Sequence, residues 1–407
     1  MMASWPNGKA FDFDFRFGVI WYQKIVGSIP AGVKASLIFL FYSSTGILRT
    51  LHKFTISTKM SAPPKPPKPQ VLRTDDGVEL SYYTIGSGPG VIIVPGAMSS
   101  ALNQYELALS LSTSYTVHLF SRRSRGLSGP YPSSVTETHT LRPPRPTDDN
   151  IDLPYDAQFC LDVLKTDLTD LFALMQHTRA TSLFGISSGA LLVLAACIHH
   201  PTDVANPFIE KAIVFDPPLI LSSPLAPRDI LPDMPSIRRY EAEIAAGKKT
   251  SALVTAMRIV QLGPGWLHVC PDFIIRFLTG LIMSAEAREQ GRRMEAGEDN
   301  EGAVTMEMLA PLLRYDFALV QAMVGDARMF NRVAEERRVL LVGGGDSPEY
   351  MRFAMGGLVD AVREGGFGAG MEWKEIGGVG HELFENKRRN GRVELGVEAA
   401  REFLARP

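Results

Sequence analysis

The stretch Gly185-Ile186-Ser187-Ser188-Gly189 constrains the fold most, because it fits the pattern Gly-x-Ser-x-Gly between two segments of different periodicity. The apolar run before it is typical of the end of a buried strand, and residues 188–199 after it are rich in Ala and Leu, as in a helix. A strand that passes directly into a helix must turn sharply at Ser187, with a positive φ there and small residues on either side. The pattern therefore predicts a strand, a tight turn and a helix, with the Ser187 hydroxyl lifted clear of a sheet.

This turn makes Ser187 a candidate nucleophile. The N–H of Ser188, at the start of the helix, is expected to face the place where an oxyanion would form. Ser188 is the poorer nucleophile candidate, because Ile186 and Ala190 stand where the pattern needs glycine. The same pattern also occurs by chance as a Gly-rich junction without chemistry, so the rest of the chain has to decide.

The chain beyond residue 70 alternates strand-like and helix-like segments. We expect an antiparallel hairpin over residues 71–83, buried strands at 91–94, 115–120, 211–215, 338–342 and 371–376, and helices at 101–111, 156–177, 188–199 and 394–404, with a further helix between Pro348 and Gly365. This alternation predicts an α/β fold with a mostly parallel, doubly wound sheet covered on both faces. The Pro-rich residues 129–154 are expected to form an irregular surface loop.

About a hundred residues before Arg338 contain no strand-like segment, and their pattern is mostly helical. We therefore expect a core formed by residues 71–218 and 331–407 and a helical cap inserted at 219–330. Residues 1–70 are expected to be an N-terminal extension that ends in a stiff linker, because residues 62–69 are almost all Pro and Lys.

Residues 1–59 differ in composition from the rest, with seven Lys or Arg, two acids and many aromatics. Their longest uncharged run, residues 35–48, has fourteen residues, whereas a bilayer span needs about 20. Two interpretations stay open: a membrane anchor or targeting segment, or an extension without a role in the fold that precedes a start at Met60.

The overall charge is nearly balanced, with 42 Lys and Arg against 44 Asp and Glu, which argues against a nucleic-acid-binding protein. Cys160, Cys197 and Cys270 are widely spaced, so they indicate neither a disulfide framework nor a zinc site. These features favour a cytoplasmic protein, with membrane association through residues 1–59 as the alternative.

Several candidate site residues follow predicted parallel strands, whose carboxyl ends meet at one edge of a sheet. They are Gly96-Ala97-Met98, Ser187, Asp216, Asp346 and His381. Singly, a loop His is usually a surface residue and an Asp a cap or turn residue. Together, in the order Ser, Asp, His, they describe a nucleophile, an orienting acid and a general base.

These motifs resemble those of the α/β-hydrolase superfamily, with a helical cap inserted after the strand that ends at Phe215. The resemblance covers about Val71 to Pro407. It rests on Pro95-Gly96-Ala97, Arg123 to Ser128, Gly185 to Gly189, Gly343 to Asp346, and Gly380-His381. The chain departs from the pattern at Pro95, where many members have His, and at Ser124-Arg125-Gly126, where a second Gly is common.

The resemblance implies a serine hydrolase that cleaves an ester of a small-to-medium apolar substrate through an acyl-enzyme, without a catalytic metal or redox cofactor. Related dehalogenases and epoxide hydrolases use Asp in place of Ser187. The implied triad is Ser187, His381 and Asp346, because the acid usually follows the penultimate strand, with Asp216 as the alternative acid. Two other classes stay open: an acyltransferase or lyase on the same triad, and an inactive binding protein on this fold.

The resemblance further implies an oxyanion hole formed by the backbone N–H groups of Ala97 and Ser188. Met98, Trp266 and Phe273 are the predicted substrate contacts, since ligand sites are mostly apolar. The two aromatic residues have an alternative role as the core of the cap.

Overall fold

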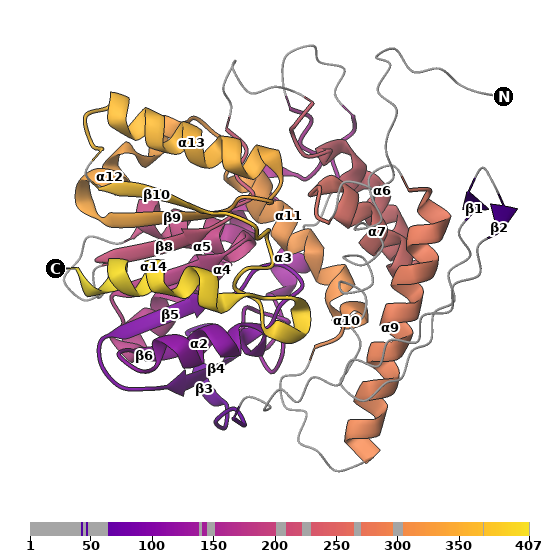
Figure 1. The fold of residues 1–407 in the computed structure, drawn as a ribbon, viewed down its shortest axis with the longest axis horizontal. Coiled ribbons are helices and arrows are strands. Elements are labelled where there is room, and N and C mark those ends of the chain that lie inside the picture. The colour runs from indigo at the N-terminus through magenta and orange to yellow at the C-terminus, as the bar shows by residue number, and fades with distance from the viewer. Residues whose placement is uncertain are drawn as a thin grey trace.

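A computed structural model gives the fold (Figure 1). It describes residues 42–43, 46–47, 64–137, 141–144, 151–200, 209–221, 229–263, 270–295, 304–368 and 370–406. Trp266 and most of the N-terminal extension therefore lie outside the described residues. Within that extension, β1 (Tyr42–Ser43) and β2 (Gly46–Ile47) form a short antiparallel pair.

An eight-stranded sheet with the order β10-β9-β8-β7-β5-β6-β4-β3 forms the centre of the molecule. Its six parallel strands are β5 (Gly90–Val94), β6 (Thr116–Phe120), β7 (Ser182–Ile186), β8 (Lys211–Phe215), β9 (Arg338–Gly344) and β10 (Met371–Ile376). The hairpin β3 (Gln70–Arg73) and β4 (Glu79–Ile85) extends the sheet in antiparallel register beside β6. The predicted parallel sheet with an N-terminal hairpin is confirmed.

Both faces of the sheet are buried. Alternate residues of each strand point to opposite faces, and the apolar residues on each face pack into a hydrophobic cluster of their own. On β5, Ile92 and Val94 join one hydrophobic cluster, whereas Val91 and Ile93 join the other. Helices cover both faces (Figure 1). The first cluster is covered by α4 (Ala157–Thr178), α5 (Ser188–His199), α12 (Asn331–Glu336) and α13 (Glu349–Glu364), and the second by α2 (Tyr105–Leu111) and α14 (Val393–Ala405).

The helix boundaries lie close to the predicted ones, with small differences at the ends. The predicted helix over residues 101–111 begins as the 3-10 turn η1 (Ala101–Gln104) before it becomes α2. The predicted loop at 129–154 contains one short helix, α3 (Ser133–Glu137). On α4, Asp156 accepts a hydrogen bond from Gln158 N–H at 2.8 Å and so caps the helix.

Between β8 and β9 the described residues form helices. Besides α12, they are η2 (Met234–Ser236), α6 (Ile237–Ala245), α7 (Lys249–Ile259), α9 (Asp272–Glu295), α10 (Met306–Leu309), η3 (Ala310–Leu312), α11 (Leu313–Ala322) and η4 (Ala327–Phe330). Figure 1 shows α6, α7, α9 and α10 gathered on one side of the sheet. In contrast, α11 packs against the core helices α4 and α5, so this segment shares one hydrophobic cluster with the sheet.

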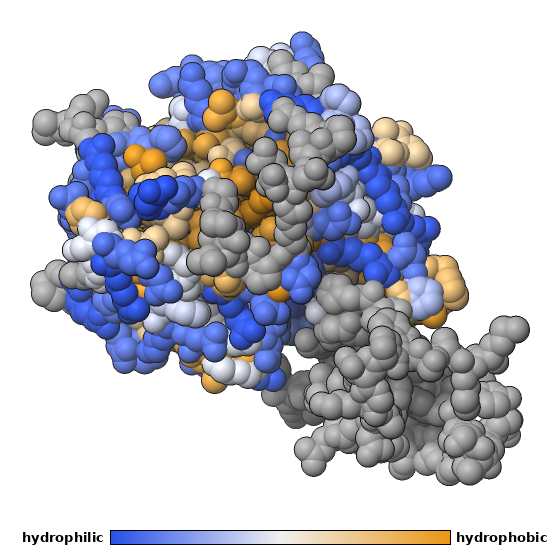
Figure 2. Space-filling model, turned by 90° about the horizontal axis from the view of Figure 1, so that it is seen from above, coloured by the Kyte–Doolittle hydropathy of each residue, from blue (hydrophilic) through white to orange (hydrophobic). Residues whose placement is uncertain are grey.

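The surface seen from above carries hydrophobic residues at its centre within a mostly hydrophilic rim (Figure 2). Among the described helices, none is both long and apolar enough to cross a membrane.

Candidate active site

The turn between β7 and α5 has the conformation that its sequence predicts. Ser187 has φ 56° and ψ −123°, and its N–H donates to the Phe215 carbonyl at 2.9 Å. A Cβ on Gly185 would lie 2.6 Å from Ala190 Cα, and one on Gly189 would lie 2.3 Å from the Val94 carbonyl oxygen. Only glycine fits at both positions, so the predicted tight turn is confirmed. We call this turn, residues 185–189, the elbow.

The turn after β5 lies directly against Ser187. A Cβ on Gly96 would be 2.7 Å from Ser187 Cβ and 3.4 Å from its Oγ. The following residues, Ala97 and Met98, are half-buried, and Met98 has a positive φ of 55°. Ser188 is the first residue of α5, where a backbone N–H has no acceptor within the helix. The two predicted donors of the oxyanion hole therefore belong to segments that flank Ser187.

His381 is paired with Asp216. Its Nδ1 lies 3.3 Å from Asp216 Oδ2, and its ring stacks on Phe215 at a centroid distance of 6.0 Å. Since the Phe215 carbonyl also accepts the hydrogen bond from Ser187, one residue contacts both the elbow and the imidazole. Among the described residues, no hydrogen bond joins the Ser187 hydroxyl to His381. Such contacts are often long in unliganded enzymes and tighten with substrate.

The surroundings of Asp216 hold its carboxylate in one place. Asp216 follows β8 with a positive φ of 44°, and its side chain is completely buried. Gly344 N–H donates to Oδ1 at 3.2 Å, and the Ser347 hydroxyl donates to Oδ2 at 2.5 Å. A buried carboxylate with these donors can orient a histidine ring through its Nδ1–H.

The preference for Asp346 as the partner of His381 is wrong in this structure. Asp346 is exposed, and its backbone N–H donates to the Val379 carbonyl at 2.9 Å. The chain turns tightly after β9, with Ser347 N–H bonded to the Gly344 carbonyl. That turn directs Ser347 inward to Asp216 and leaves the Asp346 side chain in solvent.

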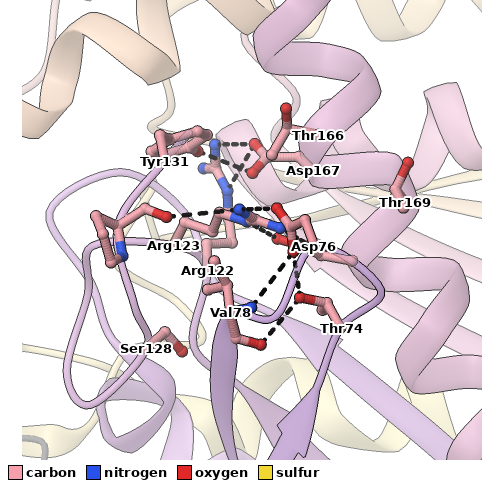
Figure 3. Close-up of polar contacts among 12 residues, drawn as sticks. Thr74, Asp76, Val78, Arg122, Arg123, Ser128, Tyr131, Thr166, Asp167 and Thr169 are labelled. Atoms are coloured by element: carbon pink, nitrogen blue, oxygen red, sulfur yellow. Dashed lines mark hydrogen bonds and ion pairs between the residues drawn. The ribbon is translucent and has the colours of Figure 1, made fainter. Parts of the chain in front are cut away.

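The three arginines of the basic loop after β6, residues 122–128, are buried, and each of their guanidinium groups has a carboxylate partner. Arg122 Nη2 lies 2.6 Å from Asp167, and Arg123 Nε lies 2.7 Å from Asp170. Figure 3 shows Arg122 directed to Asp167 and Arg123 directed to Asp76. The third, Arg125, pairs with an aspartate of α11. The three guanidinium groups of the loop are therefore paired and do not form an open site for an anionic substrate.

The loop also shows how the chain accommodates Ser124, where the motif that it resembles commonly has glycine. Ser124 stands where a second glycine is common and adopts φ 62°, a conformation that glycine tolerates more easily. Its N–H donates to the Gly129 carbonyl at 2.8 Å, and Gly126 is also left-handed at φ 58°.

Four residues near the elbow were not among the predicted site residues: Ser347, Arg125, Asp316 and Arg389. Arg389 Nη2 donates to the Met98 carbonyl at 3.0 Å, so the segment after His381 contacts the turn after β5. The sequence carried a signal for Asp316 alone, since it is the single acid of α11 and directly precedes the apolar run Phe317 to Val320. The others are polar residues in polar loops, which no spacing distinguishes.

The predicted substrate contacts have different surroundings. Met98 is half-buried in the turn beside the elbow. Phe273 is 70% exposed on α9, so it does not belong to the core of the cap. Its contact with substrate stays a prediction, as does that of Trp266.

No protein-family model matches the chain, and no curated protein matches it in sequence. Solved structures do match it. An α/β hydrolase from Sphaerobacter thermophilus DSM 20745 is 21% identical with a TM-score of 0.53, and the match covers 83% of this chain and 100% of that one. An esterase from Exiguobacterium antarcticum is 14% identical with a TM-score of 0.49, covering 83% and 99%. An enol-lactonase from Burkholderia xenovorans LB400 is 14% identical with a TM-score of 0.45, covering 83% and 100%.

Proposed function

We propose that this chain, which has the α/β-hydrolase fold, is a serine hydrolase that cleaves ester bonds through an acyl-enzyme. The observation that carries the proposal is the His381–Asp216 hydrogen bond at the sheet edge where Ser187 forms a strained turn. A non-glycine residue in such a conformation costs about 1–3 kcal/mol and persists mainly at functional sites. A serine, a histidine and a buried aspartate at one edge match the requirements of nucleophilic acyl transfer.

In the proposed reaction, Ser187 Oγ attacks the carbonyl carbon of the ester while His381 accepts its proton. The negative charge that develops on the carbonyl oxygen is stabilised by the N–H groups of Ala97 and Ser188. The ester C–O bond then breaks, and His381 returns the proton to the leaving alcohol. Water, deprotonated by His381, then attacks the acyl carbon, and His381 returns the proton to Ser187 Oγ as the acyl–oxygen bond breaks and the acid is released.

Asp216 would act through His381. Its carboxylate lies on the Nδ1 side of the ring, so it would fix the tautomer that leaves Nε2 free to accept a proton. It would also stabilise the imidazolium that forms during attack. Burial of the carboxylate strengthens this interaction, because it excludes solvent that would otherwise screen the charge.

The substrate class that we propose is a small-to-medium apolar ester. The turn beside Ser187 presents Met98, and the basic loop offers no free cation for an anionic substrate, because its guanidinium groups are paired. An apolar pocket with few polar groups would favour an acyl chain over a charged ligand.

A chain-length series of p-nitrophenyl esters with the full-length protein tests this function. We expect turnover that rises from acetate to a medium-length acyl chain and is absent in Ser187→Ala, whose smaller side chain fits the same turn. A series of added alcohols separates hydrolysis from acyl transfer through the ratio of the products, because an acyltransferase would convert most of the acyl-enzyme to a new ester although water is in large excess. Equal turnover by the wild type and Ser187→Ala would contradict the proposal.

A further inference from the structure

We propose that Asp316, together with Arg125 and the Ser188 hydroxyl, positions the two walls of the oxyanion hole relative to each other. The proposal rests on the proposed function and extends it to a residue of α11, which the chain contributes from the helical segment between β8 and β9. One wall is the turn at Gly96-Ala97, and the other is the start of α5 at Ser188.

The contacts form a continuous chain between these walls. On one side, Arg125 Nη1 donates to the Gly96 carbonyl at 3.0 Å, and Arg125 Nη2 donates to Asp316 Oδ2 at 2.6 Å. On the other side, the Ser188 hydroxyl donates to Asp316 Oδ1 at 2.7 Å. The two oxygens of one carboxylate therefore connect the two peptide segments whose N–H groups would bind the oxyanion.

The surroundings keep this carboxylate charged and fixed. Asp316 is 4% exposed, and Arg122 Nη1 also donates to it at 2.7 Å. Burial alone would raise the pKa of Asp316, but the Arg125 and Arg122 guanidinium groups, with hydrogen bonds from Arg125 and Ser188, hold it below its usual range. Because α11 packs on both α4 and α5, the backbone that carries Asp316 is itself held against the helix of the elbow.

A neighbouring ion pair shows what a purely structural role looks like. Arg123 is as buried as Arg125, and its guanidinium binds Asp170 and Asp76. Among the described residues, no hydrogen bond or ion pair joins Asp170 or Asp76 to Gly96 or Ser188, whereas Arg125 uses one nitrogen for the turn and one for Asp316. The two arginines come from the same loop and differ in whether their contacts reach the proposed site.

The matched pair Arg125→Lys and Arg123→Lys tests the proposal in the full chain. Lysine keeps the positive charge, but its single ammonium cannot reproduce a planar fork that spans two acceptors. Removing an oxyanion donor costs about 10²–10³ in kcat, and a displaced donor should cost less. We expect Arg125→Lys and Ser188→Ala each to lower kcat about tenfold with KM changed less than about twofold, and Arg123→Lys to keep kcat within about twofold.

Inhibition by a trifluoromethyl ketone, which forms an oxyanion on attack by serine, gives the second measurement. The affinity of the inhibitor should fall in parallel with kcat in Arg125→Lys and Ser188→Ala. A variant that only lost stability would bind the inhibitor with unchanged affinity in its folded fraction. The double variant should lose less than the product of the single effects, because both contacts act through one carboxylate. If Arg125→Lys does not fold, Ser188→Ala alone carries the test.

The outcomes separate this proposal from the proposed function. Equal kcat losses in Arg125→Lys and Arg123→Lys, or an unchanged inhibitor affinity in Ser188→Ala, would overturn the positioning role while leaving a working hydrolase. Absence of ester turnover in the wild type would overturn the proposed function and the positioning role together.

Discussion

Asp216 combines two features that each cost free energy, a positive φ and a completely buried carboxylate. The strained backbone alone costs about 1–3 kcal/mol, and a buried charge is tolerated only with partners. Gly344 N–H, the Ser347 hydroxyl and His381 supply those partners. This arrangement is expected for a carboxylate that orients His381, because its position matters more for catalysis than for stability.

We expect Asp216→Asn to lower kcat by about four orders of magnitude with little change in folding, because an amide at this position favours the wrong imidazole tautomer. Asp346→Asn is the matched control and should retain kcat within about twofold, since its side chain is exposed. Steady-state kinetics on one p-nitrophenyl ester decide between them. A larger loss of kcat in Asp346→Asn than in Asp216→Asn would instead support Asp346 as the acid, as the sequence favoured.

A second prediction concerns Gly96, where a Cβ would lie 2.7 Å from Ser187 Cβ and 2.9 Å from the Ile186 carbonyl oxygen. Gly96→Ala should therefore displace the turn from the elbow and lower kcat/KM at least about 100-fold, by loss of oxyanion stabilisation. Gly291→Ala on α9 is the control, because a Cβ there meets nothing within 4 Å. That variant should keep full activity and gain up to about 1 kcal/mol of stability. Full activity of Gly96→Ala would show that the turn can move freely.

At the scale of elements, the carboxyl ends of β5, β7, β8 and β9 and the loop after β10 bring the site together. The sequence predicted which loops these are, because the strand-helix alternation and the Gly-x-Ser-x-Gly turn are local patterns. It did not predict which acid reaches His381. That choice depends on whether residue 346 or residue 347 faces inward after β9, and the tight turn there is set by contacts with the backbone at Gly344 and Val379.

The role of α11 could not be predicted for a similar reason. Its sequence indicated a helix within the inserted segment, but its packing on α4 and α5 is a long-range contact. The pairing of Asp316 with Arg125 joins residues 191 positions apart. Local periodicity carries no information on such a pair.

The contact between the β3–β4 turn and the basic loop predicts a pH dependence. The Arg123 hydrogen bond lowers the pKa of Asp76 to about 2, against 3.8 ordinarily. A lowered carboxyl pKa stabilises the folded state above pH 4, and this contribution is lost as the pH falls from about 4 through about 2.

Asp76→Asn should therefore lower the free energy of unfolding at pH 7 by less than about 1 kcal/mol, since the carboxylate is partly exposed. The Tm should fall slightly as a result. The Tm difference from wild type should shrink below pH 4 and become small as the pH approaches 2. Thermal unfolding across this range measures it. A difference that stays constant down to pH 2 would mean that the ion pair contributes nothing.

At the scale of the whole molecule, the Pro-rich linker contacts the core, since the Tyr105 hydroxyl donates to the Lys65 carbonyl at 3.2 Å. A chain that begins at Met60 keeps this contact and every residue of the proposed site. We expect it to be soluble and to match the kcat of the full-length protein. Loss of activity in this form would show that residues 1–59 pack on the domain, and detergent-dependent fractionation of only the full-length protein would favour an anchor.

The central claim is that Ser187 is a nucleophile activated by His381 and Asp216. Labelling of the folded protein with a fluorophosphonate probe, followed by mass spectrometry of the labelled peptide, tests it most directly. We predict a single label on Ser187 that is absent in Ser187→Ala, retained in Ser188→Ala and Asp346→Asn, and strongly slowed in Asp216→Asn. A label on another residue, or equal labelling of the wild type and Ser187→Ala, would contradict the claim.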